Sequence, residues 1–170
     1  MSQLLGHEIL LTSEGQGTTV SLLVAEAQSS VPKTKPPTIF DIDLSDKIIL
    51  VIENEADIRY ALRLTLENWN ASVFEASTRV QAQLILKHLK YPASLIICDY
   101  RLENDDGISI ISEIQDNSVH KIPAIILTGD IVHKEIEDLE DTQILVKPVS
   151  ANKLKSAISQ SIYQKSESVA

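Results

Sequence analysis

The sequence contains a single cysteine, Cys98, and few aromatic residues: one tryptophan, two phenylalanines and four tyrosines among 170 residues. A lone cysteine cannot form an internal disulfide, and its position inside an apolar run indicates a reducing, cytoplasmic environment. So few aromatic side chains argue against a surface on which nucleic acid bases stack. The composition therefore predicts a fold that is held together by an apolar core rather than by cross-links.

The sequence also has few positively charged residues and no long apolar run. Lysine and arginine number 15 against 24 aspartates and glutamates, which gives a formal net charge of −9. With no basic surplus to neutralise phosphates, sequence-independent binding to nucleic acid is not expected. No apolar stretch approaches the roughly 18–20 residues of a membrane span, and the N-terminus lacks a basic-then-apolar signal pattern. We therefore expect no nucleic acid partner and no direct membrane contact.

The N-terminal part of the chain differs in character from the rest. Residues 7–14 and 18–25 show the alternation and the glycine-containing turn of a β-hairpin, which needs a partner surface because two strands alone are marginal in water. Prolines and lysines with little apolar content follow, as is typical of an extended linker. The expected organisation is a hairpin unit, a linker, a main domain and a tail, at residues 1–25, 26–45, 46–165 and 166–170.

The main domain alternates short apolar runs with segments of helical periodicity. Five such β-α units predict an α/β fold, a doubly wound five-stranded parallel sheet with helices on both faces. Strand 71–76 alternates and is expected at an edge, whereas the other four strands are apolar and are expected to be central. The predicted strands are 48–53, 71–76, 95–99, 123–128 and 143–146, and the predicted helices are 56–68, 80–89, 132–139, 151–163 and one that begins at 108.

Polar side chains stand where the apolar strands end. Glu53 and Asn54 follow the first strand, Asp99 ends the third, Thr128 ends the fourth, and Lys147 follows the fifth. Because the carboxyl ends of parallel strands meet at one edge of a sheet, these side chains are expected to converge.

These residue types suit phosphoryl transfer. Asp99 is a carboxylate nucleophile of the kind that forms an acyl phosphate. Neighbouring carboxylates repel one another unless a hard cation lies between them, and Mg²⁺ binds through one or two carboxylates while keeping waters. Lys147 supplies a point positive charge, and Thr128 supplies a hydroxyl donor for a phosphoryl oxygen.

Residues 47–164 resemble the receiver domain of two-component response regulators. The family motif matches at Asp99, at Thr128 and at Lys147 followed by Pro148. The resemblance implies a flavodoxin-like sheet with strand order 2-1-3-4-5, Asp99 as the phosphoacceptor, Thr128 as the switch hydroxyl, and a cis Lys-Pro bond. It also implies a Mg²⁺ site, whose ligands would be Glu53, Asn54, Asp99 and the main-chain carbonyl of Arg101.

Two positions depart from the family pattern. Asn54 stands where a carboxylate is usual, so we expect weaker metal binding, with Glu53 compensating directly or through water. Ile144, three residues before Lys147, stands where receivers often carry tyrosine or phenylalanine. An isoleucine cannot make the ring movement that reports phosphorylation, so the output face is expected to change little.

The hairpin resembles the C-terminal end of the ATP-binding domain of histidine kinases, through its Gly-x-Gly-Thr turn at Gly15, Gly17 and Thr18. An unrelated hairpin remains an alternative, because such turns are common. The order of the two resemblances implies the receiver end of a hybrid histidine kinase. The parts that would hold ATP are absent, so whether the chain is an enzyme stays open, with at most self-phosphorylation and dephosphorylation at Asp99.

The implied partners are a histidine kinase or a histidine phosphotransfer protein, and a dimer is compatible with the sequence. Docking would use the first helix, at Ile58, Ala61, Leu62 and Thr65, although core packing alone also explains the inward-facing ones. The main alternative is a receiver-like scaffold that acts by protein contact without turning over phosphate.

Two further alternatives are disfavoured by single features of the sequence. An aspartate-based phosphohydrolase needs a second carboxylate two residues after Asp99, where Arg101 stands. A flavin or dinucleotide module needs a glycine- or hydroxyl-rich loop after the first strand, and the acidic loop at 53–57 would repel phosphates.

Overall fold

The structure is a computed structural model that describes residues 9–14, 17–22, 42–103, 105–129 and 141–163. The chain divides into two units, Met1–Thr38 and Ile39–Ala170, and each is considered by itself. Among the described residues, no helix has both the length and the apolar character needed to cross a membrane. The helix predicted at 132–139 lies outside the described residues.

The smaller unit contains the hairpin. Strands β1 (Ile9–Glu14) and β2 (Gly17–Leu22) pair in antiparallel fashion, so that Leu11 lies opposite Val20. The side chains of Leu11 and Val20 are 68% and 64% exposed. The hairpin thus has exposed apolar side chains, as expected of two strands that need a partner surface.

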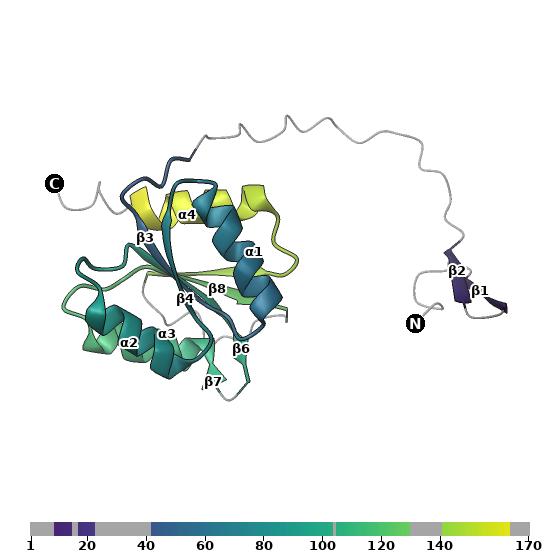
Figure 1. The fold of residues 1–170 in the computed structure, drawn as a ribbon, viewed down its shortest axis with the longest axis horizontal. Helices are drawn as coiled ribbons and strands as arrows, with labels where there is room; N and C mark the ends of the chain where they lie inside the picture. The colour runs from purple at the N-terminus through teal and green to yellow at the C-terminus, as the bar shows by residue number, and fades with distance from the viewer. Residues whose placement is uncertain (1–8, 15–16, 23–41, 104, 130–140, 164–170) are drawn as a thin grey trace. The chain divides into compact units, whose positions relative to one another are not determined.

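The larger unit is built around five parallel strands in the order β4-β3-β5-β8-β9, with α1 and α4 on one face of the sheet and α2 and α3 on the other (Figure 1). This arrangement confirms the predicted fold class and strand order. Each of the five parallel strands and of the four described helices begins within one residue of its predicted start. The strands are β3 (Ile48–Ile52), β4 (Ser72–Ala76), β5 (Leu95–Asp99), β8 (Ala124–Thr128) and β9 (Thr142–Val146), and the helices are α1 (Ala56–Glu67), α2 (Arg79–His88), α3 (Gly107–Asn117) and α4 (Ala151–Tyr163).

Side-chain caps define where two of the helices begin. The hydroxyl of Thr78 accepts a hydrogen bond from the Gln81 amide at the start of α2. At the start of α3, the carboxylate of Asp106 accepts from both the amide and the hydroxyl of Ser109, at 2.8 and 2.6 Å. The bonds from the Gln81 and Ser109 amides satisfy main-chain donors that have no partner within the first helical turn.

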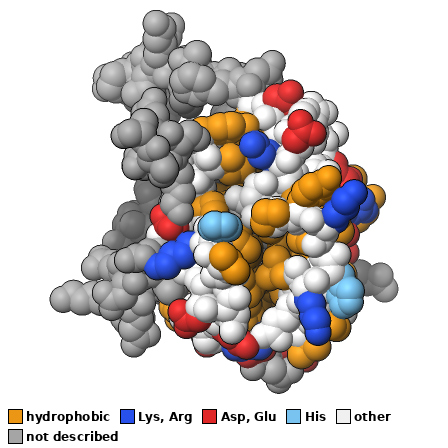
Figure 2. All heavy atoms as spheres, turned by 90° about the vertical axis from the view of Figure 1, so that its left-hand side faces the viewer, with side chains coloured by type: hydrophobic (Ala, Val, Ile, Leu, Met, Phe, Trp, Pro, Cys, Tyr) orange, Lys and Arg blue, Asp and Glu red, His pale blue; other side chains and the backbone are white. Residues whose placement is uncertain are grey.

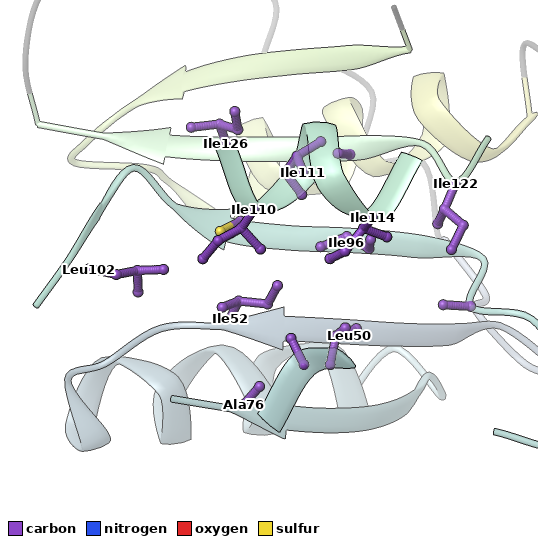
Figure 3. Packing of buried hydrophobic residues seen from close by; sticks show 14 residues of the cluster. Leu50, Ile52, Ala76, Ile96, Leu102, Ile110, Ile111, Ile114, Ile122 and Ile126 are labelled. Carbon is purple, nitrogen blue, oxygen red and sulfur yellow. The ribbon is translucent and has the colours of Figure 1, made fainter. Parts of the chain in front are cut away.

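The core consists of two apolar layers, one on each face of the sheet. The layer between the sheet and helices α2 and α3 is apolar and rich in isoleucine (Figure 3). Leu102 lies at the end of this layer towards which the strands point, and Ile122 lies at the opposite end. The fully buried members include Leu50, Ile52, Ala82, Ile96, Ile110, Ile111, Ala124 and Ile126.

The second layer, beneath α1 and α4, extends to residues that precede the sheet. Leu44 is fully buried in it and Ile42 packs against it. The Tyr163 hydroxyl at the end of α4 donates a hydrogen bond to the main-chain carbonyl of Asp43, at 3.0 Å. The packed part of the larger unit therefore includes Ile42 and Leu44, which lie within the stretch that composition suggests is linker.

The prediction that strand five is central is wrong. β9 is the last strand in the sheet order and pairs with β8, and its residues are half-buried or exposed. Its apolar pair divides between the two layers, with Ile144 packing on one face and Leu145 on the other. A strand with one apolar side chain per face has an apolar run in sequence even at an edge.

The sequence pattern did not predict a short antiparallel ribbon that follows β5. Strands β6 (Arg101–Leu102) and β7 (Asp105–Asp106) form a two-stranded antiparallel ribbon directly after β5. The acidic composition of this stretch suggests only a turn, and two-residue strands are too short to give a periodic signal. The ribbon projects at the edge where the parallel strands end (Figure 1).

The opposite edge of the sheet has a different character. Figure 2 shows one face of the molecule, on which apolar side chains gather between scattered charged ones. Tyr91 and Val119, in the loops that lead into β5 and β8, are 62% and 94% exposed. The converging polar residues therefore lie at the edge of the sheet remote from these loops.

Gly107, the first residue of α3, packs directly against the end of β5. A Cβ at this position would collide with the main-chain carbonyl oxygen of Asp99 and would lie 3.2 Å from Cys98 Sγ. The Gly107 amide donates to the Tyr100 carbonyl at 2.9 Å, which closes the chain excursion that contains the ribbon. Glycine is therefore required by the close approach of two main-chain segments.

We predict that Gly107→Ala lowers the free energy of unfolding by about 1–3 kcal/mol, because the added methyl group forces a backbone shift in a packed region. Urea denaturation measures the change. Gly129→Ala is the matched control, since no atom beyond its adjacent residues lies within 4 Å of its Cβ position, and it should change stability by less than about 0.5 kcal/mol. Equal effects of the two substitutions would contradict the steric explanation.

Candidate functional site

Three polar side chains are buried where the central strands end. Asp99 is the last residue of β5, Thr128 is the last residue of β8, and Glu53 directly follows β3. They are 8%, 1% and 1% exposed. The register pairs Asp99 with Leu127, which places Thr128 one residue further along the neighbouring strand. The parallel topology thus brings these groups to one edge of the sheet.

Lys147, just after β9, joins two of these groups. Its Nζ lies 2.8 Å from Asp99 Oδ1 and 3.4 Å from Glu53 Oε2. Its main-chain amide donates to the Thr128 carbonyl at 2.6 Å, and the Lys147-Pro148 peptide bond is cis. The structure thus brings Glu53, Asp99 and Lys147 into contact, and it places Thr128 beside Lys147 through the main chain.

Burial and mutual charge shift the ionisation of this group. Burial raises the pKa of the Glu53 carboxyl, and the negative charge of Asp99 raises it further. Burial acts to lower the pKa of Lys147, but its hydrogen bond to Asp99 and the charges of Asp99 and Glu53 outweigh burial, so the pKa is raised. The ammonium form is therefore favoured between the two carboxylates.

The loop between β3 and α1 is braced by an arginine that sequence reasoning missed. Arg59 Nη1 donates to the main-chain carbonyls of Glu53 and Asn54, at 2.5 and 3.2 Å. Glu53 Oε1 accepts from the Glu55 amide at 3.0 Å. Asn54 is half-buried between these anchored neighbours. An arginine in the first turn after an acidic loop is the only sequence signal that points to this brace.

The segment after Asp99 carries the predicted main-chain ligand, the carbonyl of Arg101. The Gly107 amide donates a hydrogen bond to the Tyr100 carbonyl. Facing pairs in an antiparallel ladder alternate between hydrogen-bonded and non-hydrogen-bonded, so the next pair, Arg101 and Asp106, is of the non-hydrogen-bonded kind. In such a pair the main-chain groups point away from the partner strand. The ribbon register therefore turns the Arg101 carbonyl outward from β7.

The donor set suits a small hard cation. Among the described residues, no group of three or more histidine, cysteine, aspartate and glutamate side chains is placed to hold a metal. Two buried carboxylates, Glu53 and Asp99, face one another across Lys147, and Asn54 can contribute only a neutral carbonyl oxygen. Mg²⁺ accepts such a set because it uses one or two carboxylates and keeps waters. The chemistry of these residues therefore fits Mg²⁺.

The readout and docking positions are packed in different ways. Ile144 is half-buried and packs against the layer beneath α2 and α3. On α1, Leu62 packs against the opposite layer, Ala61 is exposed, and Ile58 is half-buried. The Thr65 hydroxyl donates to the Ala61 carbonyl at 2.8 Å. Only part of the predicted docking set is thus available to a partner.

Comparison with known proteins decides the family. The family model of the response regulator receiver domain matches residues 49–159, which is more than half of the chain. The chain belongs to this family. The receiver domain contains every residue of the cluster described above, from Glu53 to Lys147.

The curated relatives are response regulators and a response regulator-like protein. The transcriptional regulatory protein ResD of Bacillus subtilis is 36% identical over 81 residues, which are 48% of this chain and 32% of ResD. The KDP operon transcriptional regulatory protein KdpE of Escherichia coli is 37% identical over 81 residues, 48% of this chain and 34% of KdpE. APRR7 of Arabidopsis thaliana is 28% identical over 111 residues, 63% of this chain and 15% of APRR7. The chain thus spans about a third or less of these relatives.

Solved structures share the receiver fold. A response regulator receiver domain protein from Clostridium thermocellum is 28% identical with a TM-score of 0.61, over 71% of this chain and 97% of that one. A receiver protein from Pseudomonas putida is 26% identical with a TM-score of 0.61, over 67% and 96%. The receiver domain of the hybrid histidine kinase CckA, 20% identical with a TM-score of 0.58 over 68% and 98%, shows a common fold alone.

The raised pKa of Glu53 gives the receiver domain a pH-dependent stability in metal-free buffer. A carboxyl with a higher pKa in the folded chain binds more protons when folded, in the pH range from about its ordinary value of 4.5 upward. The free energy of unfolding therefore falls as pH rises through this range. Glu53→Gln removes this contribution, so its stability relative to the wild type should rise between about pH 4 and about pH 7.

Urea denaturation with a chelator present measures this difference at both pH values, and comparison with the wild type cancels the other titrating groups. Glu55→Gln, at an exposed neighbouring carboxyl, serves as the control and should show a smaller change with pH. A difference for Glu53→Gln that stays constant or falls as pH rises would show that burial of this carboxylate is not costly.

Proposed function

We propose that this receiver domain accepts a phosphoryl group on Asp99 from a phosphohistidine, as one step of a two-component or phosphorelay pathway. The observation that carries the proposal is the contact of Lys147 Nζ with the buried carboxylate of Asp99, beside the buried Glu53. A buried aspartate held by an ammonium group at the carboxyl edge of the sheet is suited to nucleophilic attack on phosphorus.

The proposed reaction balances in atoms and charge when one proton is taken from solvent. A carboxylate oxygen of Asp99 attacks the phosphorus, an O–P bond forms, and the N–P bond of the donor phosphohistidine breaks. The electron pair of that bond stays on the imidazole nitrogen, which takes up a proton. Lys147 supplies positive charge beside the carboxylate and then beside the phosphoryl oxygens, and Thr128 supplies a hydroxyl donor to one of them.

The metal ligands in this proposal are Glu53, Asn54, Asp99 and the main-chain carbonyl of Arg101. Bound Mg²⁺ supplies positive charge that offsets the negative charge of the carboxylates and of the incoming phosphoryl group. The chain itself places the donors: Arg59 holds the main chain of Glu53 and Asn54. Because Asn54 brings no charge, we infer weaker affinity than two adjacent carboxylates would give.

The proposed context is the receiver of a hybrid histidine kinase in the cytoplasm. The hairpin and its Gly-x-Gly-Thr turn support a preceding ATP-binding domain, and its exposed Leu11 and Val20 are what a strand pair separated from such a domain would show. The partner would be a histidine kinase or a histidine phosphotransfer protein that covers α1 near Ala61.

A scaffold without phosphate turnover is the second candidate. Asn54 and Ile144 favour it, because the first weakens the metal site and the second provides no aromatic readout. The close contact between Lys147 and Asp99 opposes it, since a scaffold does not require a buried carboxylate at the sheet edge.

The phosphoacceptor role predicts that the purified chain gains one phosphoryl group from acetyl phosphate in the presence of Mg²⁺, with acetate as the leaving group. Intact mass spectrometry measures the gain. Asp99→Asn removes the nucleophile and should abolish the gain, whereas wild type treated with a chelator should react much more slowly. No adduct on the wild type, even at high Mg²⁺, would favour the scaffold.

The assignment of Asn54 to the metal site predicts that Asn54→Asp tightens Mg²⁺ binding by about tenfold, equivalent to about 1.4 kcal/mol, because a charged ligand replaces a neutral one. Isothermal titration calorimetry measures the affinity. Asn117→Asp adds the same charge at the far end of α3 and is the control, for which affinity should not change. Unchanged affinity in Asn54→Asp would place Asn54 outside the metal site.

A further inference from the structure

Arg79 occupies an electrostatically unfavourable position on its own helix. It is the first residue of α2, and the first turn of this helix contains no acidic residue. The N-terminus of a helix carries partial positive charge, so a cation there is disfavoured locally. A residue that breaks a local rule is expected to have compensating contacts elsewhere.

Those contacts all come from the segment that follows Asp99 and from the helix after it. Arg79 Nη2 lies 2.7 Å from Asp105 Oδ1, and Nε donates to the same oxygen at 3.1 Å. Arg79 also pairs with the carboxylate of Glu113 and donates to the Ser109 hydroxyl at 3.0 Å. Gln83, one turn along α2, donates to the other oxygen of Glu113 at 2.7 Å.

These partners raise the pKa of the Arg79 guanidinium further above its ordinary value, mainly through the hydrogen bonds to Asp105 and Glu113. The planar guanidinium has five donors in a fixed fork, so it can hold several acceptors at once in one geometry. A lysine would keep the charge but could not reproduce this arrangement.

The network fixes the outgoing strand of the β6–β7 ribbon. The first strand of the ribbon, β6, is anchored to the rest of the domain, because Leu102 is buried in the apolar layer and the Tyr100 amide donates to the Leu127 carbonyl at 2.8 Å. The outgoing strand begins at Asp105, whose side chain is partly exposed and is held by Arg79. Arg101 lies opposite Asp106 in the same ribbon.

We propose that Arg79 is a positioning residue for the metal site, because its contact with Asp105 holds the ribbon that presents the main-chain carbonyl of Arg101. This inference rests on the proposed function, in which that carbonyl is a Mg²⁺ ligand. Mg²⁺ requires nearly octahedral ligands at short distance, so a loosened ribbon weakens binding without removing any ligand. Residues that orient metal ligands affect affinity about 10–100-fold when they are replaced.

The experiment measures the initial rate of phosphorylation by acetyl phosphate as a function of Mg²⁺ concentration, for the full chain and its variants. Arg79→Ala should raise the Mg²⁺ concentration for half-maximal rate by about tenfold, with the maximal rate at saturating Mg²⁺ largely retained. Arg79→Lys should recover part of this loss. The matched control is Arg63→Ala, which removes an arginine that pairs with Glu67 and Glu75 at 3.1 and 3.0 Å, away from the ribbon.

A rise confined to the Arg79 variants supports the inference. An unchanged Mg²⁺ dependence in Arg79→Ala, or the same rise in Arg63→Ala, overturns it. Asp105→Asn weakens the same contact from the other side and should produce a similar rise, so it replaces Arg79→Ala if that variant does not fold. Adding Asp105→Asn to Arg79→Ala should add little to the effect of Arg79→Ala, because the contact that Asp105→Asn weakens is already lost.

A failure of the proposed function is distinguishable from a failure of this inference. If the wild type takes up no phosphoryl group, the phosphoacceptor role is wrong, and the inference is judged by a Mg²⁺ titration of the Tyr100 and Gly107 amide resonances. Weaker binding in Arg79→Ala than in the wild type then supports it. Equal affinities, or no binding to the wild type, overturn it.

Discussion

The carboxyl edge of the sheet depends on one ammonium group that faces two buried carboxylates. Lys147, just after β9, contacts Asp99 on β5, which lies two positions away in the sheet, and Glu53 just after β3, which lies three positions away. Without the lysine, two buried negative charges would face each other with no compensating positive charge between them. The same contact therefore stabilises this edge of the sheet and, in the proposed function, holds the carboxylate that would attack phosphorus.

Convergence at this edge could be predicted because topology does most of the placement. Once each apolar run is recognised as a parallel strand, the residue after it must lie at the carboxyl edge, whatever the length of the connecting helix. Asp99 and Lys147 are 48 residues apart in sequence but meet at 2.8 Å for this reason. The roles proposed for these residues and the metal site remain predictions.

The sequence could not predict contacts that long side chains make with residues in other helices, strands or loops. Arg59 reaches back to the main chain of the preceding loop, and Arg79 reaches the ribbon 26 residues later. The requirement for glycine at Gly107 is likewise invisible without the three-dimensional approach of α3 to the end of β5. The apolar pattern alone misplaced β9 as a central strand, although the strand order implied by the receiver resemblance places it at an edge, because an apolar pair in sequence does not reveal that its two side chains go to opposite faces.

The two departures from the family pattern have linked physical consequences. With Asn54, the charges of Glu53, Asp99 and Lys147 sum to −1, whereas a carboxylate at position 54 would make the sum −2. The neutral residue therefore lowers repulsion in the metal-free fold and, for the same reason, lowers attraction for a cation. Ile144 packs within the apolar layer, so phosphorylation of Asp99 would be transmitted mainly through its main-chain neighbours. Tyr100 connects this main chain to β8 and Gly107 connects it to α3, which makes the ribbon between them the element best placed to respond.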